Sequence, residues 1–520
     1  MAKTTKIKKE KPFEALLWDT AIALRGNVEP SEYKHIVLSL IFLKVTSDKF
    51  ELKRAKLIEE GQEQYIERPE FYQMDNIFFL EEISRWNYII GKAKQKEIAI
   101  IIDTALHTIE KNNPVLRGAL PDNYFSRLEL DESKLASLLD TINGFDTQKD
   151  SSLDVVGKVY EYFLSKFALA EGKGKGEFYT PKSIVNLIAE MIEPYRGLIY
   201  DPACGTGGMF VQSIKFIEAH QGNKMDVSIY GQEYTSTTYK LAKMNLAIRG
   251  ISANMGLKAT DTFSDDQHKD LKADFVMANP PFNQKDWRKE NELLDDPRWK
   301  GYDVPPKSNA NYAWILNIVS KLSANGIAGF ILANGALSGG GEEYKIRKSL
   351  IENNLVEAIL VLPQNMFYTT NISVTLWILN KNKKAITRTI GSTTRQYRHR
   401  EEEILFMDLR QMGEPFEKKF IQFSTDDIQK IVSTYHQWQV APIENVPEFC
   451  YSASIEEIRK KEYSLVPSKY IEFINRDEQI DFDVKMATLQ VEISQLLREE
   501  EQSKQDLLTV FKELGYEIKL

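Results

Sequence analysis

The sequence has few of the features that mark secreted or membrane-spanning chains. Its 520 residues include only two cysteines, Cys204 and Cys450, which are too few for a disulfide framework. No run of about 18 apolar residues is present, so no membrane span is predicted. The basic start MAKTTKIKKEKPFE lacks the apolar stretch of a secretion signal. These features predict a cytoplasmic protein that does not associate with membranes.

The chain also lacks an excess of positive charge. Its 75 acidic residues outnumber the 67 lysines and arginines, and the formal net charge is −8. Such a balance does not by itself indicate nucleic-acid binding. If DNA is a substrate, a local basic patch or a partner chain must supply the phosphate contacts. The residues predict no metal site, and the length predicts about three domains.

The first domain, residues 1–168, is predicted to be all-helical. Apolar residues recur at helical spacing, and Pro30 stands where a first helical position is expected. Trp18, Tyr33 and Phe42 are interpreted as core residues rather than as a ligand site. A Gly/Lys run at 172–176 then reads as a flexible linker.

The second domain, residues 169–475, alternates short apolar runs with helical patterns, which is typical of an α/β fold with helices on both faces of a mostly parallel sheet. The expected strands are 197–203, 227–232, 273–278, 326–333, 355–362 and 373–380, and the expected helices lie near 209–220, 236–250, 311–323 and 342–353. No helix fits between the last two strands, so the strand at 373–380 is predicted to be antiparallel.

The third domain, residues 476–520, is predicted to be one long C-terminal helix. Its apolar residues follow a 3–4 spacing that Glu500 and Ser503 interrupt, and Gly515 is a plausible stop; they are Met486, Leu489, Ile493, Leu496, Leu507, Val510 and Leu514. Two interpretations stay open: the helix packs on its own chain, or it joins a helix of a partner.

The stretch DPACGTGGMF follows the first expected strand and opens a helix. Glycines at 205, 207 and 208 allow positive φ and let a ligand approach the backbone. Asp201 at the strand end suits a cationic or zwitterionic ligand better than a diphosphate. A purely structural turn is the alternative.

Two further acids favour a nucleoside pocket. Glu233 ends the second strand, where a carboxylate holds a ribose diol in dinucleotide folds. Asp261 lies near the third strand, where it can meet an adenine amino group; the alternative is a helix or turn cap.

The stretch ANPPFN ends the strand at 273–278. Pro280 restrains Asn279 to extended angles, and Pro280 and Pro281 both lack an N–H group. An amide oxygen, a free carbonyl at Pro280 and the flat ring of Phe282 suit a planar base with an exocyclic amino group. A Pro-Pro turn with a buried Phe is the alternative.

DPACGTGG and NPPF, in this order, resemble the motifs of S-adenosylmethionine-dependent adenine-N6 DNA methyltransferases. Nearly the whole chain resembles the modification (methylase) subunit of type I restriction–modification systems, including LWDTAIALRGNVEPSEYKHIVLSLIFLK, GEFYTPKSIVNLIAEM and LPQNMFYTTNISVTLWILNK. The resemblance implies a Rossmann-like S-adenosylmethionine-dependent methyltransferase domain, between the helical N-terminal domain and a C-terminal helix for subunit association. It also implies base flipping and a role in host defence.

The resemblance assigns roles to individual residues. Asn279, Pro280, Pro281 and Phe282 match the catalytic tetrapeptide. The cofactor site is matched by Asp201, Gly205, Thr206, Gly207, Gly208, Glu233 and Asp261, and by the segment Glu177, Phe178, Tyr179, Thr180, Pro181 and Lys182, which is expected to close over the methionine end. Protein-glutamine methyltransferases carry a similar motif, usually with Tyr at its fourth position, and Phe282 favours DNA.

Little of the sequence is left to read a DNA target. The family solves this with a separate specificity subunit, bound by two modification subunits, and a restriction subunit can join. The partners implied are therefore double-stranded DNA and these subunits. Methylation of protein or RNA, or a non-catalytic scaffold role, are the competing hypotheses.

Two further segments carry open interpretations. The stretch 381–400 is irregular and holds Lys381, Lys383, Lys384, Arg388, Arg395, Arg398 and Arg400 without an acid. It either touches DNA phosphates or is a solvated loop. The stretch 285–312 is interpreted as a mobile insertion that orders around a flipped base.

Overall fold

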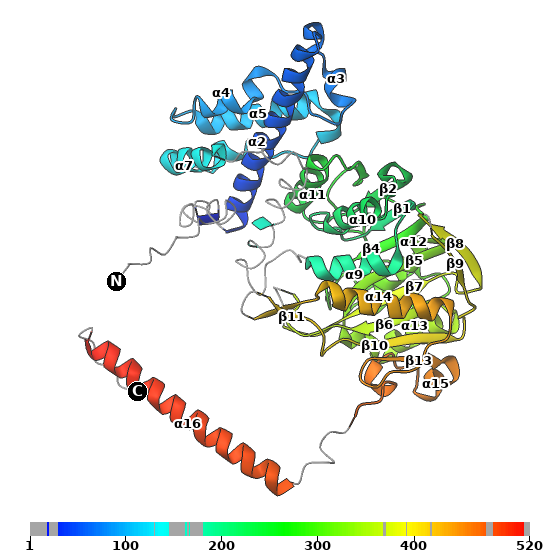
Figure 1. Cartoon of the computed structure of the whole chain (residues 1–520). Coiled ribbons are helices and arrows are strands. Elements are labelled where there is room, and N and C mark those ends of the chain that lie inside the picture. The colour runs from blue at the N-terminus through cyan, green and yellow to red at the C-terminus, as the bar shows by residue number, and fades with distance from the viewer. Residues whose placement is uncertain are drawn as a thin grey trace. The chain divides into compact units, whose positions relative to one another are not determined.

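The structure is a computed structural model of the chain, and it describes residues 18–19, 30–128, 130–144, 162–163, 166, 180–367, 371–391, 393–416, 419–474 and 482–513. Two compact units are distinguished. The larger holds the described residues up to Asn445 together with Phe449–Ile471, and the smaller holds Val446–Glu448 and the described residues from Glu472 onward. Figure 1 labels the elements of both units. Within the described ranges, no helix combines the length and apolar character that crossing a membrane requires.

The first part of the larger unit is helical, as predicted. Its α-helices are α2 (Pro30–Glu59), α3 (Pro69–Gln73), α4 (Trp86–Ile90), α5 (Ile98–Asn112), α6 (Tyr124–Arg127) and α7 (Glu132–Asn143). Pro30 begins α2, where its missing N–H group costs no hydrogen bond. Phe42 is fully buried and Trp18 packs against the same core, so both are core residues as predicted. The side chain of Tyr33 lies outside the described residues.

The second part of the larger unit is built on a mixed sheet. Among the described residues, nine strands pair in the order β13-β10-β6-β7-β5-β4-β1-β2-β3. The strands are β1 (Gly197–Asp201), β2 (Val227–Gly231), β3 (Ala253–Asn254), β4 (Ala273–Ala278), β5 (Leu322–Ala333), β6 (Val356–Val361), β7 (Val374–Asn380), β10 (Glu403–Asp408) and β13 (Cys450–Ser454). β7 runs antiparallel to β5 and β6, as predicted, and β13 runs antiparallel to β10. The other pairs are parallel.

Helices cover both faces of this sheet (Figure 1), which confirms the predicted α/β class. They are α9 (Lys182–Ile192), α10 (Gly208–Ala219), α11 (Ser236–Ile248), α12 (Asn311–Lys321), α13 (Gly341–Glu352), α14 (Thr425–Val440) and α15 (Ile455–Lys460). Alternate strand residues point to opposite faces. Ile199 and Met277 therefore pack with α9, α10 and α14, whereas Tyr200 and Val276 pack with α12, α13 and α15.

Helix α11 joins the two parts of the larger unit. Leu241, Met244 and Ile248 lie in the core of the N-terminal helices, whereas Ala242 and Leu246 lie in the core beside the sheet. Hydrogen bonds reinforce this packing, and they include Lys49 Nζ to the Ile248 carbonyl at 2.9 Å and Lys240 Nζ to the Leu120 carbonyl at 3.2 Å. The helical part and the sheet thus share a packed boundary.

The region after residue 381 contains more regular structure than predicted. Two antiparallel hairpins, β8 (Ile386–Ile390) with β9 (Thr393–Tyr397) and β11 (Glu414–Phe416) with β12 (Phe420–Gln422), precede α14. The prediction that 381–400 is irregular is therefore wrong. Strands β8 and β9 are half exposed and rich in Thr and Arg, so they carry no apolar run that would reveal them.

The smaller unit contains the long helix α16 (Phe482–Glu513), which confirms the predicted C-terminal helix. Leu514 and the proposed stop at Gly515 lie outside the described residues. The described apolar side chains of the predicted stripe are all exposed; Met486 is the least exposed, at 40%, and Leu496 the most exposed, at 63%.

Candidate active site

A cavity of about 760 Å³ opens where the parallel strands β1, β2 and β4 end. Its lining includes Ala203 and Gly205 after β1, Glu233 after β2 and Asn279 after β4. The carboxyl ends of parallel strands meet at one edge of a sheet, which is where α/β folds bind their ligands. Three motifs that are far apart in the sequence therefore meet at one cavity.

The glycine loop after β1 is fixed to the end of β2. Gly205 has φ +53° and Gly207, which caps α10, has φ +79°. The Gly205 N–H donates to Glu233 Oε2 at 3.1 Å. A Cβ at Gly207 would lie 3.5 Å from Leu246, whereas a Cβ at Gly208 would meet no atom within 4 Å. The positive φ at 205 and 207 explains why the loop uses glycine there.

The Glu233 carboxylate accepts hydrogen bonds from the backbone of the protein. Its Oε1 accepts from the Thr235 N–H at 2.8 Å, and its Oε2 accepts from Gly205. Each carboxylate oxygen has a second lone pair. Glu233 therefore links the glycine loop to β2 and lines the cavity, and its predicted contact with a ribose stays a prediction.

Asp201 lies behind the cavity rather than in its lining. Its side chain is 1% exposed and accepts a hydrogen bond from the Ala203 N–H at 3.0 Å. The pKa of Asp201 is raised to about 8. Burial is the largest cause, the Ala203 hydrogen bond opposes it, and the nearby Glu233 carboxylate adds to it. In this geometry Asp201 stabilises the glycine loop through its hydrogen bond with the Ala203 N–H.

Asp261 lines the cavity and also caps a turn. The Ser264 N–H donates to Asp261 Oδ2 at 2.9 Å, so the turn-cap alternative is confirmed for this oxygen. The turn is anchored next to the site, because Thr262 Oγ1 donates to the Pro202 carbonyl at 2.6 Å. The cap does not exclude the predicted contact with an adenine amino group, which stays a prediction.

Asn279 is held by a residue from a distant part of the chain. Its Nδ2 donates to Thr180 Oγ1 at 3.0 Å, and its Oδ1 is buried without a hydrogen-bond partner among the described residues. A buried carbonyl oxygen without a partner is costly unless a ligand satisfies it. Thr180 belongs to the predicted cofactor segment 177–182, so this hydrogen bond brings the described part of that segment to the catalytic motif.

The rest of that segment is placed only in part. Pro181 is buried and caps α9, and Lys182 is exposed at the first position of this helix. Glu177, Phe178 and Tyr179 lie outside the described residues. The structure thus places Thr180 at the site and leaves the predicted closure over a cofactor untested.

The residues after Asn279 differ in their surroundings. Pro281 lines the cavity, and Pro280 is buried. The Phe282 ring meets Phe367 edge-to-face, with ring centroids 5.8 Å apart. This contact fixes one edge of the Phe282 ring, and stacking of a base on its face stays a prediction.

The cavity also contains residues that the sequence analysis missed. Gln284 Oε1 and Trp314 Nε1 are buried and have no hydrogen-bond partner in the described ranges, and both residues line the cavity. Trp314 packs against Phe263 with ring centroids 4.3 Å apart. Gln284 lies five positions after Asn279, and this closeness to the motif was the only signal that marked it.

The segment 285–312 forms one wall of the cavity. Trp287 and Trp299 are buried, and Trp287 Nε1 donates to the Pro306 carbonyl at 2.9 Å. Arg298 donates to the carbonyls of Thr262 and Phe263. The segment is thus packed on the site by its aromatic residues, and its mobility stays a prediction.

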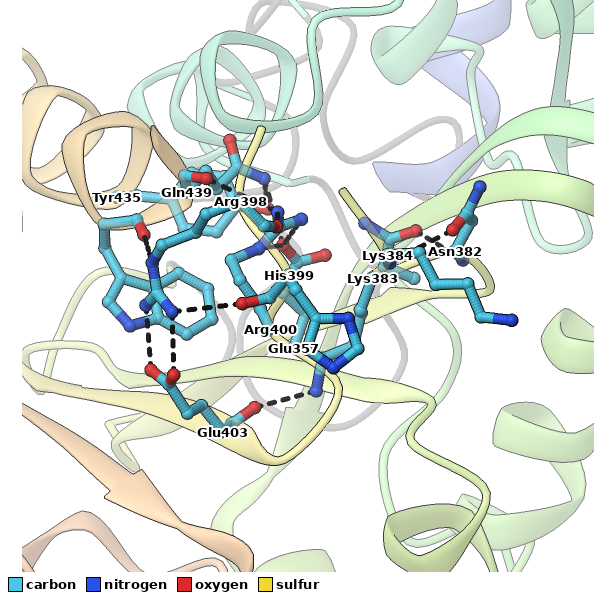
Figure 2. A network of polar contacts seen from close by, with 12 residues as sticks. Glu357, Asn382, Lys383, Lys384, Arg398, His399, Arg400, Glu403, Tyr435 and Gln439 are labelled. Atoms are coloured by element: carbon cyan, nitrogen blue, oxygen red, sulfur yellow. Dashed lines mark hydrogen bonds and ion pairs between the residues drawn. The ribbon is translucent and has the colours of Figure 1, made fainter. Parts of the chain in front are cut away.

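Two basic side chains of the stretch 381–400 are buried in the protein interior. Lys383 and Arg400 are each 2% exposed, and Arg400 pairs with the fully buried Glu357 at 2.9 Å. Figure 2 shows this network, in which Lys383 Nζ also donates to the Glu403 carbonyl at 2.7 Å. Burial lowers the pKa of Lys383 to about 8. Neither open interpretation, phosphate contact or solvated loop, is correct for these two residues.

Two further arginines of the stretch are paired with acids. Arg398 forms a two-pronged ion pair with Glu403 at 2.7 and 2.8 Å, and Arg395 pairs with Glu193 at 2.7 Å. Lys381 and Lys384 are exposed. Most of the positive charge of this stretch therefore stabilises the region around β10 and α14.

Comparison with known proteins agrees with this geometry. The N-6 DNA Methylase family model matches residues 151–479, and the HsdM N-terminal domain model matches residues 13–142. The type I restriction enzyme HindI methylase subunit of Haemophilus influenzae is 43% identical over 436 residues, which cover 81% of this chain and 93% of that protein. The MjaIX methylase subunit of Methanocaldococcus jannaschii is 35% identical over 97% of this chain and 92% of its own length.

Solved structures show the same fold. The type I restriction–modification methyltransferase subunit from Streptococcus thermophilus has a TM-score of 0.73 at 23% identity, covering 88% of this chain and 99% of that one. A modification subunit of a putative type I restriction enzyme from Vibrio vulnificus has a TM-score of 0.61 at 19% identity, covering 86% and 94%.

The fold, with its cavity at the carboxyl edge of the sheet, is that of the type I restriction–modification methyltransferase subunits. The chain belongs to the N-6 DNA methylase family, as a methylase subunit of the type I restriction–modification class. The enzyme class predicted from the motifs, an adenine-specific DNA methyltransferase, is confirmed by this membership.

Proposed function

We propose that this chain transfers a methyl group from S-adenosylmethionine to the N6 amino group of adenine in a specific sequence of double-stranded DNA, and that a partner subunit supplies the specificity. One observation carries the proposal. Within the part of the chain that the structure describes, the buried Oδ1 of Asn279 has no hydrogen-bond partner, and Asn279 lines a cavity together with Glu233 and Asp261. An acceptor at the edge where nucleosides bind suits an exocyclic amino group.

The catalytic end of the site acts by accepting hydrogen bonds. The adenine amino group has two N–H donors, and we assign them to Asn279 Oδ1 and to the Pro280 carbonyl. Accepting both bonds localises the nitrogen lone pair, which is otherwise delocalised into the ring. Asn279 takes no proton in this scheme: when the amine nitrogen gains the methyl group, its surplus proton goes to solvent, and S-adenosylhomocysteine is the second product. Positioning and electrostatic stabilisation then supply the acceleration.

The target base has to leave the duplex to reach this site. Asn279 is only 7% exposed, at the end of β4, and a base stacked in DNA cannot approach it. We assign the face of the extruded ring to Phe282. Gln284 and Trp314, one with an unpartnered acceptor and the other with an unpartnered donor, offer additional contacts in the same cavity.

The residues present fit an adenosine-containing cofactor. The cavity volume of about 760 Å³ is in the usual range for ligands of this size. S-adenosylmethionine, when bound, supplies a methyl group on a sulfonium sulfur. We assign the ribose to Glu233, the adenine amino group to Asp261, and the backbone at 205–208 to close contact with the ligand. Asp201 supports this loop, and the segment 177–182 covers the methionine end.

The chain acts as part of a larger assembly in this proposal. Residues 1–168 form the helical domain, 169–475 the catalytic domain and 476–520 the helix for subunit association. Two such subunits bind one specificity subunit, and a restriction subunit joins where it is present. The exposed apolar stripe of α16 supports the association role, because it is unusual for a helix to leave so many apolar side chains in solvent.

Methyl transfer to different acceptors tests the proposal. The purified chain with its specificity subunit is supplied with labelled S-adenosylmethionine and with duplex DNA, RNA or protein. We expect label in duplex DNA only, and mass spectrometry of the nucleosides should identify N6-methyladenine. Label in protein or RNA, or at another base, would contradict the assignment.

A further inference from the structure

A second cavity, of about 420 Å³, lies on the boundary between the N-terminal helices and the sheet, and we call it the seam pocket. It is lined by five basic side chains, Lys49, Lys53, Lys56, Lys224 and Arg249, and by one acidic side chain, Asp75. The whole chain has a formal charge of −8, so this concentration of positive charge is a local feature. A site that concentrates one sign of charge in a hollow attracts ligands of the opposite sign.

Three separate elements bring these side chains together. Lys49, Lys53 and Lys56 are spaced i, i+4 and i+7, which places them on one face of α2. Lys224 begins the short 3-10 helix η4 (Lys224–Asp226), and Arg249 follows the last residue of α11. The charges therefore surround the pocket rather than lie along a single helix.

Among the described residues, acids pair with two of the lysines of the seam pocket, Lys53 and Lys56. Lys53 pairs with Asp75 at 2.5 Å, and Lys56 contacts the exposed Glu60 at 3.8 Å. Lys49 donates to the Ile248 carbonyl at 2.9 Å, and within the described ranges no carboxylate is in ion-pair distance of Lys49 or Lys224. The pKa of Lys49 is lowered to about 8, mainly by burial and in addition by the like charges of Arg249 and Lys224.

We propose that the seam pocket binds a phosphate group, either as a free anion or as part of a nucleic-acid backbone. A tetrahedral phosphate presents oxygens in several directions, which matches cations that converge from three elements. A carboxylate has two oxygens in one plane and would leave some of these cations unmatched. Lysine is a common phosphate ligand that acts as a point charge.

The seam pocket is also connected to the glycine loop. Arg249 donates to the Asn245 carbonyl at 3.0 Å and contacts the Asn245 side chain. Asn245 Nδ2 in turn donates to the Thr206 carbonyl at 2.7 Å. A phosphate that repositions Arg249 thus changes the support of the loop. The resulting coupling to cofactor binding rests on the proposed function, whereas the phosphate site itself does not.

Chemical labelling of lysines tests the phosphate site on the full chain. The protein is acetylated briefly at pH 8 in inorganic phosphate, or in chloride of equal ionic strength, and the modified lysines are quantified by mass spectrometry. At a phosphate concentration about ten times Kd, we expect labelling of Lys49 to fall about tenfold. The exposed Lys384 is the internal control and should label equally in both salts.

Variants and a second ligand make the outcome decisive. Lys224→Gln should weaken the protection of Lys49 without changing thermal stability, because Lys224 makes no ion pair within the described ranges. Protection by a duplex oligonucleotide at concentrations far below those needed for phosphate would identify the backbone as the source; protection by phosphate alone would identify the free anion. Equal Lys49 labelling in phosphate, chloride and DNA would overturn the proposal.

The test is independent of methyl transfer. Asn279→Ala, which removes the proposed catalytic amide, should keep the protection of Lys49. If methyl transfer fails in every assay but Lys49 is still protected, the proposed function is wrong and the phosphate site stands. The reverse result overturns the phosphate site alone.

Discussion

The side chains of Asn279 and Thr180 are joined by a hydrogen bond of 3.0 Å, in which Nδ2 of the amide is the donor and the hydroxyl oxygen is the acceptor. This bond occupies the nitrogen end of the carboxamide and orients the oxygen end, which no described residue contacts by a hydrogen bond. Thr180 is therefore a positioning residue for the group that we assign to the target amine.

Replacing these two residues should separate binding from catalysis. Asn279→Ala should lower kcat by at least about 100-fold and leave the affinity for S-adenosylmethionine near normal, because the amide acts on the acceptor base. Thr180→Val should lower kcat by about tenfold with little change in KM for DNA, because the amide loses its orientation. Steady-state kinetics and calorimetry measure these effects.

The conservative variant Thr180→Ser is the control, since it keeps the hydroxyl and should restore most of kcat. Native kinetics in Thr180→Val would remove the positioning role, and substantial transfer by Asn279→Ala would contradict the assigned chemistry.

Two neighbouring glycines should respond differently to alanine. Gly207→Ala should lower the free energy of unfolding by about 1–2 kcal/mol, because the backbone there has φ +79°. Gly208→Ala has no such strain and meets no protein atom, so stability should be retained. If the cofactor contacts this backbone, Gly208→Ala should still weaken its binding. Denaturation and calorimetry on both variants check this, and full affinity in Gly208→Ala would argue against close contact.

Asp201 should make the stability of the protein depend on pH. Its pKa of about 8 in the folded chain is higher than that of an unfolded aspartate, about 3.9. The folded state therefore binds more protons between these values, and this contribution to the free energy of unfolding falls as pH rises from about 4 to about 8. Asp201→Asn removes the titration, so its melting temperature should rise relative to the native protein between pH 5 and pH 8. Parallel curves would show that Asp201 ionises normally.

The buried pair of Arg400 and Glu357 should be sensitive to loss of one partner. Arg400→Ala leaves a fully buried carboxylate unpaired and should cost about 3–5 kcal/mol of stability. Replacing both residues, as in Glu357→Leu with Arg400→Met, should cost less than the single change. Lys384→Ala, an exposed change in the same stretch, should stay within about 0.5 kcal/mol. Urea titration measures all three, and an unchanged midpoint in Arg400→Ala would refute the role of the pair.

The stripe of α16 should be required for assembly. Leu489→Asp with Leu496→Asp places two charges in the stripe and should abolish co-elution with the specificity subunit in size-exclusion chromatography. Ser494→Asp introduces the same charge at an exposed position on the far side of the helix from these two leucines and should be tolerated. Deletion of 481–520 should also break assembly with the specificity subunit, while cofactor binding is retained. An intact complex with the double variant or the deletion would exclude this helix from the association.

The central sheet was predictable because its inner strands are buried on both faces. Every residue of β6 and β7 is buried, and these strands appear in the sequence as apolar runs in which Glu357, Thr375 and Asn380 are the exceptions. Strand β3 has only two residues, and the β8–β9 hairpin is half exposed and polar, so neither leaves such a signal. The pattern therefore reveals most of the core strands. It missed the inner strand β10, whose residues from Ile404 to Asp408 are buried.

The site was predictable where it depends on strand ends. Asn279, Glu233 and Gly205 each follow a strand directly, and parallel strands bring their ends together. The partner of Asn279 lies 99 positions away in the sequence, and no local pattern could reveal it. Gln284 and Trp314 reach the cavity through the packing of the segment between them, which depends on tertiary contacts.

Helix α11 places a constraint on how such chains can be recombined. Its two faces are completed by different parts of the polypeptide, Met244 by the N-terminal helices and Ala242 by the layer beside the sheet. In a chimera that takes residues 1–144 from a relative, the exchanged helices would therefore pack against an α11 surface of different sequence. Functional hybrids should require matched substitutions at Leu241, Met244 and Ile248, so inheritance of the bundle is tied to a helix encoded about a hundred codons downstream.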